Sequence, residues 1–133
     1  MEREGVVEFA VKALIINDGR FLAVHKMGLD SPKYELPGGR LMFGETAEET
    51  VVREVLEETG LCVSPVELVD TWNFIKGNRQ IAGIIYLCAA EDVENIILSD
   101  EHDCYEWLGT DDESLEKMNR LFKPQMKKYF LNE

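Results

Sequence analysis

The stretch GRLMFGETAEETVVREVLEETGL, residues 39–61, joins a helix-length, glutamate-rich run to a glycine at each end. In a helix, Glu54, Glu57 and Glu58 stand at i, i+3 and i+4, so their carboxylates share one face. Like charges at this spacing repel one another, and Arg53 is the nearest cation in the stretch. A divalent cation with oxygen ligands would remove that repulsion, so the stretch predicts a metal-binding face. The glutamates alone also fit an exposed acidic helix on an acidic protein.

Capping signals define where this helix begins and ends. Thr46 is a suitable N-cap, and Glu49 three residues later completes a capping box for a helix from 47 to about 59. Gly60 suits the C-cap position. The apolar positions predict the side that the helix buries: Ala47, Val51, Val52, Val55 and Leu56.

The spacing of the fixed residues resembles the signature of the Nudix (MutT-like) hydrolases. That signature runs Gly, five residues, Glu, seven residues, then Arg-Glu-apolar-x-Glu-Glu-x-Gly-apolar. The residues that fill it here are Gly39, Glu45, Arg53, Glu54, Val55, Glu57, Glu58, Gly60 and Leu61. The resemblance implies an α/β (α+β) fold, the Nudix α/β/α sandwich with a central mixed sheet, and an enzyme that hydrolyses phosphoanhydride bonds.

The resemblance also implies a Mg²⁺ site, with Mn²⁺ as a substitute ion. Its ligands would be the carboxylates of Glu54, Glu57 and Glu58 and the main-chain carbonyl of Gly39, which the Gly38-Gly39 bend brings toward the helix. A bound metal ion lowers the pKa of a water molecule, and a carboxylate then takes the proton. By the resemblance, Glu54 is the candidate for that base, directly or by coordinating it, with a purely metal-ligand role as the alternative. We expect Arg53 and Glu57 to complete the catalytic set.

Residues of this stretch, together with Gly38 just before it, are predicted to support the site. Arg53 lies four residues from both Glu49 and Glu57, so it can hold carboxylates in place. Glu45 is expected to support the metal loop, or to interact with the helix dipole. Gly38 and Gly60 provide backbone conformations that other residues rarely adopt.

A second acidic segment, Ser99 to Asp103, precedes a predicted strand at 105–108. By the resemblance, Glu101 is a further metal ligand, with Asp100 and Asp103 as alternatives. A solvated acidic loop is an equal alternative. His102 could act as a base or contact phosphate, but we expect it to be exposed.

Substrate-binding residues are less strongly indicated. Asn119 is a candidate reader of a base, Phe74 a candidate stacking platform, and Lys26 a candidate phosphate contact. Strand aromatics are often core residues, and lysines at strand ends are often solvated. Further candidates of the same kinds are Trp72, Phe43, Lys33 and Arg79.

Composition restricts the partners. The 133 residues suit one domain, residues 1–133, and the formal net charge of −12 argues against a nucleic-acid polymer as partner. No apolar run is long enough for a membrane helix, and the charged N-terminus lacks a signal-peptide pattern, so we expect a cytoplasmic protein without a membrane partner. Cys62, Cys88 and Cys104 are odd in number and widely spaced, which indicates reduced thiols.

The order of the remaining elements favours a mixed sheet over a doubly wound parallel one. Strands are predicted at 6–16, 20–26, 34–36, 66–75, 80–90 and 105–108. Hairpin turns are predicted at 17–19 and 76–79, a polar loop at 28–33, and C-terminal helices at 111–121 and 124–131.

Together these features predict a Mg²⁺-dependent pyrophosphohydrolase that cleaves a nucleoside diphosphate linked to another moiety. A nucleoside triphosphate, including an oxidised one, giving the monophosphate and pyrophosphate, is the first expectation. Nucleotide-sugar or dinucleotide hydrolysis is the alternative within the same chemistry, and a non-catalytic nucleotide-sensing module is the alternative outside it. Monomer and homodimer both remain open.

Overall fold

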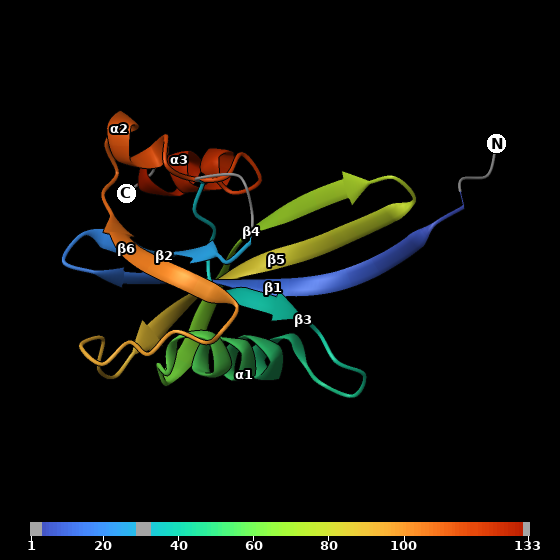
Figure 1. The fold of residues 1–133 in the computed structure, drawn as a ribbon, viewed down its shortest axis with the longest axis horizontal. Coiled ribbons are helices and arrows are strands. Elements are labelled where there is room, and N and C mark those ends of the chain that lie inside the picture. Colours follow the sequence, from blue (N-terminus) through green and yellow to red (C-terminus); the bar gives the residue numbers. More distant parts are fainter. Residues whose placement is uncertain (1–3, 29–32, 132–133) are drawn as a thin grey trace.

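A mixed sheet lies between one helix on its lower face and two helices on its upper face (Figure 1). The computed structural model describes residues 4–28 and 33–131. The strands are β1 (Val6–Asn17), β2 (Arg20–Lys26), β3 (Gly38–Arg40), β4 (Val63–Lys76), β5 (Arg79–Ala90) and β6 (His102–Leu108). The helices are α1 (Ala47–Thr59), α2 (Asp112–Leu115) and α3 (Lys123–Leu131). The predicted α/β/α arrangement is confirmed.

Strand β1 pairs with different strands along its length. Its strand order is β4-β5-β1-β2-β6, with β3 paired to β1 beside this path. The β1–β5 pair is parallel and the other pairs are antiparallel, so the predicted mixed sheet is confirmed. β1 pairs with β2 only around Ile16, whereas Ala10 to Lys12 pair with β3. This division places the Gly38-Gly39 segment against the middle of β1, facing α1.

The predicted turn between β1 and β2 is also confirmed. Asp18 and Gly19 have φ angles of 53° and 73°, both in the left-handed region. Two consecutive left-handed residues match the right-handed twist of the flanking strands, and aspartate and glycine tolerate that conformation well. The second hairpin is equally tight, because β4 ends at Lys76 and β5 begins at Arg79.

Helix α1 has the predicted bounds and caps. The Thr46 side chain accepts a hydrogen bond from the Glu49 backbone, and the Glu49 carboxylate accepts one from the Thr46 N–H at 3.0 Å. Gly60 ends the helix at φ 76°, and its N–H donates to the carbonyl of Leu56. These local capping signals set where the helix begins and ends.

The buried side of α1 differs in part from the prediction. Val51 and Val55 are fully buried, but Val52 is 36% exposed and Leu56 is 49% exposed. Thr50, Glu58 and Thr59 are buried instead. The helix packs on the sheet through the stripe centred on Val51 and Val55, which turns Val52 and Leu56 away from it.

Each face of the sheet has its own apolar core. Between the sheet and α1 the core includes Val11, Ala13, Ile15, Leu22, Val51, Val55, Leu61, Val63 and Cys88. Between the sheet and the C-terminal helices it includes Ala10, Leu14, Phe21, Leu36, Trp72, Ile85, Leu108, Leu115, Phe122 and Met126. Alternate residues of β1 supply both cores, as expected of a strand covered on both sides.

The predicted helix at 111–121 is wrong beyond its first turn. α2 ends at Leu115, and the following backbone pairs with Tyr34. The Tyr34 N–H donates to the Lys117 carbonyl and the Asn119 N–H donates to the Tyr34 carbonyl, each at 2.8 Å. These long-range hydrogen bonds satisfy backbone groups that a longer helix would have paired internally.

Other strand boundaries also depart from the predictions. The predicted strand at 34–36 is absent: Tyr34 and Glu35 form isolated bridges, whereas β3 was not predicted. β4 begins at Val63 and includes Pro65, next to an irregularity in its pairing with β5. β6 begins at His102. Part of the predicted loop at 28–33, residues 29–32, lies outside the described residues.

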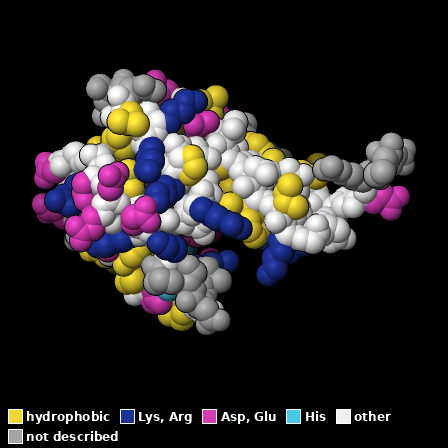
Figure 2. Space-filling view, turned by 90° about the horizontal axis from the view of Figure 1, so that it is seen from above, with side chains coloured by type: hydrophobic (Ala, Val, Ile, Leu, Met, Phe, Trp, Pro, Cys, Tyr) yellow, Lys and Arg dark blue, Asp and Glu magenta, His cyan; other side chains and the backbone are white. Residues whose placement is uncertain are grey.

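The charged side chains are unevenly distributed. Figure 2, viewed from the side of α2 and α3, shows Lys and Arg side chains across this face and Asp and Glu side chains mostly toward its left end, on a protein with a formal net charge of −12. Helix α1, with its acidic stretch, lies on the opposite side of the sheet (Figure 1). Within the described residues, no helix is long and apolar enough to cross a membrane.

Candidate active site

Two glycines bring the strand β3 close to α1 and β1. A Cβ atom at Gly39 would lie 2.5 Å from the carboxylate carbon of Glu54. One at Gly38, where φ is 141°, would lie 2.1 Å from the Val11 carbonyl oxygen. Neither distance can accommodate a side chain, so glycine at both positions is what lets the backbone meet the helix. The predicted juxtaposition of Gly38-Gly39 with the acidic helix is therefore present.

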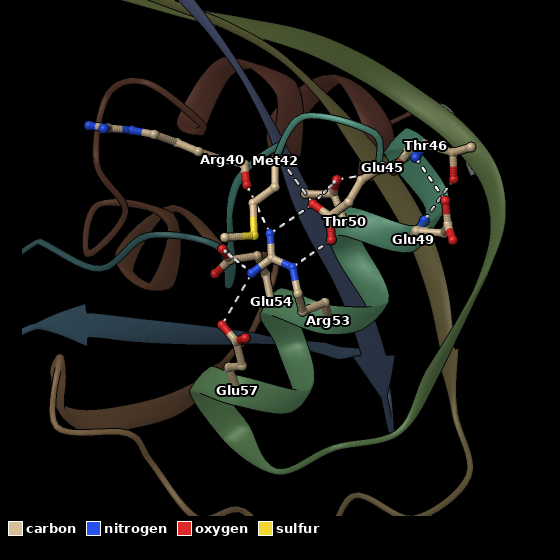
Figure 3. Close-up of polar contacts among 9 residues, drawn as sticks. All are labelled: Arg40, Met42, Glu45, Thr46, Glu49, Thr50, Arg53, Glu54 and Glu57. Atoms are coloured by element: carbon tan, nitrogen blue, oxygen red, sulfur yellow. Dashed lines mark hydrogen bonds and ion pairs between the residues drawn. The ribbon is translucent and has the colours of Figure 1, made fainter.

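Arg53 is the centre of a hydrogen-bonded group of carboxylates (Figure 3). Its Nε and Nη2 donate to the two oxygens of Glu45 at 2.6 and 2.9 Å. Its Nη1 donates to Glu54 at 3.0 Å and to Glu57 at 3.2 Å. Nη2 also donates to the Arg40 carbonyl at 3.1 Å, which ties the guanidinium to the end of β3. Glu49, the other expected partner, is used in the capping box instead.

Glu45 anchors this group from the loop before α1. Besides Arg53, its carboxylate accepts hydrogen bonds from the Met42 N–H at 2.9 Å and the Thr50 hydroxyl at 3.1 Å. Hydrogen bonding from Arg53, helped by the Met42 N–H, lowers the pKa of Glu45 to about 2. Glu45 is therefore an ionised acceptor at neutral pH that holds the arginine and the loop, and its support role in the site stays a prediction.

Glu58 has the opposite environment on the same helix. Its side chain is buried, with the residue 3% exposed, and one oxygen accepts a hydrogen bond from the Gly38 N–H at 3.0 Å. Burial raises the pKa of Glu58 to about 8; the charge of Lys12 opposes this rise and the charge of Glu54 adds to it. Because a nearby cation favours the ionised form, positive charge arriving at this carboxyl would lower its pKa again.

His102 contacts this buried carboxyl, and the expectation that it would be exposed is wrong. It is 5% exposed, and its Nε2 lies 3.3 Å from an oxygen of Glu58. The preceding loop is fixed to the end of α1 by hydrogen bonds from the Ile97 N–H to the Thr59 carbonyl and from the Ser99 N–H to the Glu58 carbonyl. Burial lowers the pKa of His102. Sequence reasoning missed it because a histidine flanked by acidic residues gives no sign of burial.

The same contacts bring the Glu101 segment to the carboxylate face. Glu101 itself is exposed, and its carbonyl accepts a hydrogen bond from the Met27 N–H at 2.7 Å. Asp103, one of its alternatives, is engaged elsewhere, because its carboxylate lies 2.8 Å from Nδ1 of His25. Glu101 therefore stays the predicted ligand from this loop.

Lys12 is a further buried polar residue that sequence reasoning missed. It is 7% exposed, and its Nζ lies 3.4 Å from both the Glu35 carboxylate and the Gly38 carbonyl oxygen. The ammonium also lies over the rings of Trp72 and Phe122, at 6.0 and 5.7 Å from their centroids. A lysine inside the apolar run of β1 was the available signal, since such a charge needs a buried partner.

The predicted substrate-binding residues are less clearly placed. The Asn119 side chain accepts a hydrogen bond from the Leu121 N–H at 3.0 Å, which shapes the turn before α3. Phe74 packs against the core beside α3, and Lys26 is exposed at the end of β2. Trp72 is a core residue and Phe43 is fully solvent-exposed. The roles of Asn119, Phe74 and Lys26 stay predictions.

The donor chemistry of the acidic face fits a hard divalent cation. Glu54, Glu57, Glu58 and the Gly39 carbonyl offer oxygen ligands only. Arg53 holds Glu54 and Glu57 toward itself, and among the described residues no three carboxylates of this face converge within 4.8 Å. The Glu54 carboxylate lies where a Cβ atom of residue 39 would be, directly against the Gly39 backbone.

Comparison with known proteins agrees with this geometry. The family model of the NUDIX domain matches residues 8–130. The chain belongs to the Nudix family. A "MutT-like protein" of Streptomyces ambofaciens is 36% identical over 110 residues, which are 82% of this chain and 67% of that protein. Nudix hydrolases act on phosphoanhydride bonds, so the prediction of a hydrolytic enzyme family is confirmed.

One further relative and one solved structure add detail. An asymmetrical bis(5'-nucleosyl)-tetraphosphatase of Rattus norvegicus is 33% identical over 81 residues, 57% of this chain and 55% of that protein. The crystal structure of a MutT protein from Methanosarcina mazei Go1 superposes with a TM-score of 0.83 and 27% identity, covering 99% of this chain and 97% of that one. The chain thus spans about two thirds of the first of these curated relatives, about half of the second, and nearly all of the solved structure.

Proposed function

We propose that this protein is a Mg²⁺-dependent pyrophosphohydrolase, able to use Mn²⁺, that cleaves a nucleoside diphosphate linked to another moiety. Its first substrate class would be a nucleoside triphosphate, including an oxidised one, converted to the monophosphate and pyrophosphate. The observation that supports this most strongly is the acidic face of α1, where Glu54 lies against Gly39 and Arg53 joins Glu45, Glu54 and Glu57.

Divalent metal ions would be held by Glu54, Glu57, Glu58 and the Gly39 carbonyl, with Glu101 from the neighbouring loop. When bound, such an ion neutralises phosphate charge and makes water a stronger acid. The buried carboxyl of Glu58 supplies the best-shielded ligand, because it is enclosed by Gly38 and His102. Glu57 is the most accessible of the three glutamates, with 58% of its side chain exposed.

The reaction adds water across one P–O–P linkage. The water oxygen forms a bond to phosphorus, the bridging P–O bond breaks, and the bridging oxygen leaves on the other phosphate. Glu54 is proposed to accept the proton that the water loses, since its carboxylate faces the Gly39 backbone and is held in place by Arg53. Glu57 completes the carboxylate pair that Arg53 orients.

Arg53 acts by position. Its two hydrogen bonds to Glu45 fix the guanidinium plane. Its Nη1 then orients the carboxylates of Glu54 and Glu57. A lysine has the same charge but lacks this fork of donors. Glu45, Gly38 and Gly60 are proposed to support the same geometry, the first by its hydrogen bonds and the glycines by their backbone conformations.

Substrate choice rests on the relatives and on charge. The MutT-named proteins match 82% and 99% of this chain, which favours a nucleoside triphosphate. The rat tetraphosphatase matches 57% and favours a dinucleoside polyphosphate as the second candidate. Asn119, Phe74 and Lys26 are proposed to contact the nucleotide. We propose residues 1–133 as one domain acting on small nucleotides, not on nucleic-acid polymers, with a cytoplasmic location as the expectation.

The test is release of phosphate or pyrophosphate from nucleoside triphosphates, dinucleoside polyphosphates and nucleotide sugars, with Mg²⁺ and with EDTA. We expect Mg²⁺-dependent release concentrated on one class, with pyrophosphate as the product from triphosphates. Glu57→Gln should lose most of this turnover. The matched control is Glu48→Gln on the same helix, where the amide oxygen can still accept the hydrogen bond from Tyr86. Full activity in EDTA, or in Glu57→Gln, would contradict the proposal.

A further inference from the structure

A second group of metal-ligating side chains lies at the β2–β6 edge of the sheet, labelled in Figure 1. His25, Asp103 and Cys104 each offer one donor atom, and the three atoms lie within 4.8 Å of one another. His25 is the Cα partner of Cys104 across the β2–β6 ladder. The three residues belong to two strands, so a ligand held between them would join those strands.

A strand irregularity makes this convergence possible. Consecutive side chains of a regular strand point to opposite faces, so Asp103 and Cys104 should not approach the same neighbour. The β2–β6 register shifts between His25 and Lys26, so that Lys26 pairs with His102 and Asp103 is left as the extra residue. A bulge of this kind redirects a side chain. It lets the Asp103 carboxylate lie 2.8 Å from His25 Nδ1 on the side where Cys104 also lies.

We propose that His25, Asp103 and Cys104 bind one Zn²⁺ ion. Imidazole nitrogen, carboxylate oxygen and thiolate sulfur are the three ligand types that zinc takes in proteins, and thiolate disfavours Mg²⁺ at the same place. The fourth position would be filled by water or by the Tyr34 hydroxyl, which lies 3.5 Å from the Cys104 sulfur. His25 and Tyr34 also pack edge to face, with their ring centroids 5.9 Å apart.

The observed distance between His25 and Asp103 can be compared with that of a coordinated pair. Ligand distances of ~2.0–2.1 Å in a tetrahedral site place nitrogen and oxygen donors roughly 3.3 Å apart. The His25–Asp103 separation is 2.8 Å, so the pair would open by about half an ångström. Cys104 and Asp103 are exposed, so an ion can reach both from solvent.

The proposed zinc site of His25, Asp103 and Cys104 is distinct from the acidic face of α1. His102 turns toward Glu58, whereas Asp103 and Cys104 face His25. Zinc at this site would link β6 to β2 directly after His102. It would thereby restrain the segment that contacts Glu58, without supplying a ligand to the hydrolytic centre.

The test uses Co²⁺ as a spectroscopic substitute for Zn²⁺, with the full chain and Mg²⁺ in excess to occupy oxygen-only sites. We expect a thiolate-to-cobalt charge-transfer absorption that saturates at one equivalent and disappears when Zn²⁺ is added. Cys104→Ser should abolish the band. Cys62→Ser, which changes another exposed thiol, should keep it, and so should Glu57→Gln.

A second variant guards against a folding defect in Cys104→Ser. His25→Gln should retain the fold by circular dichroism and weaken Co²⁺ binding by about tenfold or more. The proposal is overturned if the wild-type protein shows no charge-transfer band. It is also overturned if the band survives Cys104→Ser, is lost in Cys62→Ser, or is unchanged in affinity in His25→Gln.

Discussion

Glu45 and Glu58 lie at opposite ends of one acidic stretch and have opposite electrostatic environments. Glu45 bonds to a guanidinium, a backbone N–H and a hydroxyl, and its pKa falls to about 2. Glu58 is buried, and its pKa rises to about 8. The first carboxylate is already neutralised by the protein. Positive charge arriving at the second would lower its pKa again. Under the proposal, Glu45 supports the site and Glu58 receives the metal ion.

The middle of the stretch links these two ends. Arg53 bonds to Glu45 on one side and to Glu54 and Glu57 on the other. Glu54 also adds to the repulsion that Glu58 experiences. A substitution of Arg53 or Glu54 should therefore alter the environments of both Glu45 and Glu58. Substitutions of Glu45 and of Glu58 should have independent effects.

The largest expected effect comes from removing the proposed base. Glu54→Gln keeps the size of the side chain but cannot accept a proton, so kcat should fall by about 10²–10⁴-fold. Steady-state kinetics on the preferred substrate with saturating Mg²⁺ measure this. Glu48→Gln is the control on the same helix and should change kcat little. A fall of less than about fivefold in Glu54→Gln would assign the base to another residue.

Replacing Arg53, which links Glu45 to Glu54 and Glu57, should have a smaller effect. Arg53→Lys keeps the positive charge but cannot bond to Glu45 and Glu54 at the same time as a planar fork, so activity or Mg²⁺ affinity should fall about 10–100-fold. Mg²⁺ titration of activity separates the two quantities. Unchanged kinetics would show that charge alone, without orientation, is what Arg53 supplies.

The buried carboxyl of Glu58 should make metal binding depend on pH. The proposed Mg²⁺ site requires ionised Glu58, so below pH 8 binding there must release the proton, and apparent affinity should rise with pH by up to about tenfold per unit before levelling off above pH 8. The metal-free protein should show the opposite trend in stability. The native state holds this proton between pH 4.5 and 8 and the unfolded state does not, so stability falls as pH rises through that range.

Calorimetric titration with Mg²⁺ in buffers of different ionisation enthalpy measures the released proton. Glu58→Gln is the matched variant, because it keeps the shape of the side chain and removes the titration. It should bind Mg²⁺ weakly with a flatter pH profile. A wild-type affinity independent of pH between 6 and 8 would contradict the environment described for Glu58.

Replacing Glu45, the carboxylate paired with Arg53, should have the smallest effect, and that effect should shrink in acid. A lowered pKa means that ionised Glu45 stabilises the fold above its ordinary pKa of 4.5 and loses this contribution as pH falls through about 2. Glu45→Gln should therefore lower the thermal unfolding temperature slightly at pH 7. The difference should shrink below pH 4 and with added salt, because solvent screens the pair. A constant difference down to pH 2 would mean that packing, not charge, explains it.

Helix α1 and the turns were predictable because their signals are local. The Thr46–Glu49 capping box, the Gly60 C-cap and the Asp18-Gly19 turn each depend on residues within a few positions of one another. The acidic face follows from the same helical spacing. The pairing of Glu57 with Arg53 one turn away was accessible for the same reason.

The errors have a common physical cause, which is competition from distant partners. The helix predicted at 111–121 ends at Leu115 because the backbone around Asn119 pairs with Tyr34. His102 was expected in solvent, but the Ser99 loop is fixed to the end of α1 and carries it onto Glu58. Lys12 is buried because Glu35 and Gly38 supply acceptors from another part of the chain.

The sequence by itself determined which helix carries the carboxylates, where that helix begins and ends, and which family the chain belongs to, because spacing along a helix fixes a shared face. Only the tertiary structure decided which carboxyl is buried, because burial depends on what packs against it from β3 and the loop before β6. It also decided that a bulge in β6 brings Asp103 and Cys104 to His25, since strand register is a property of two segments and not of one.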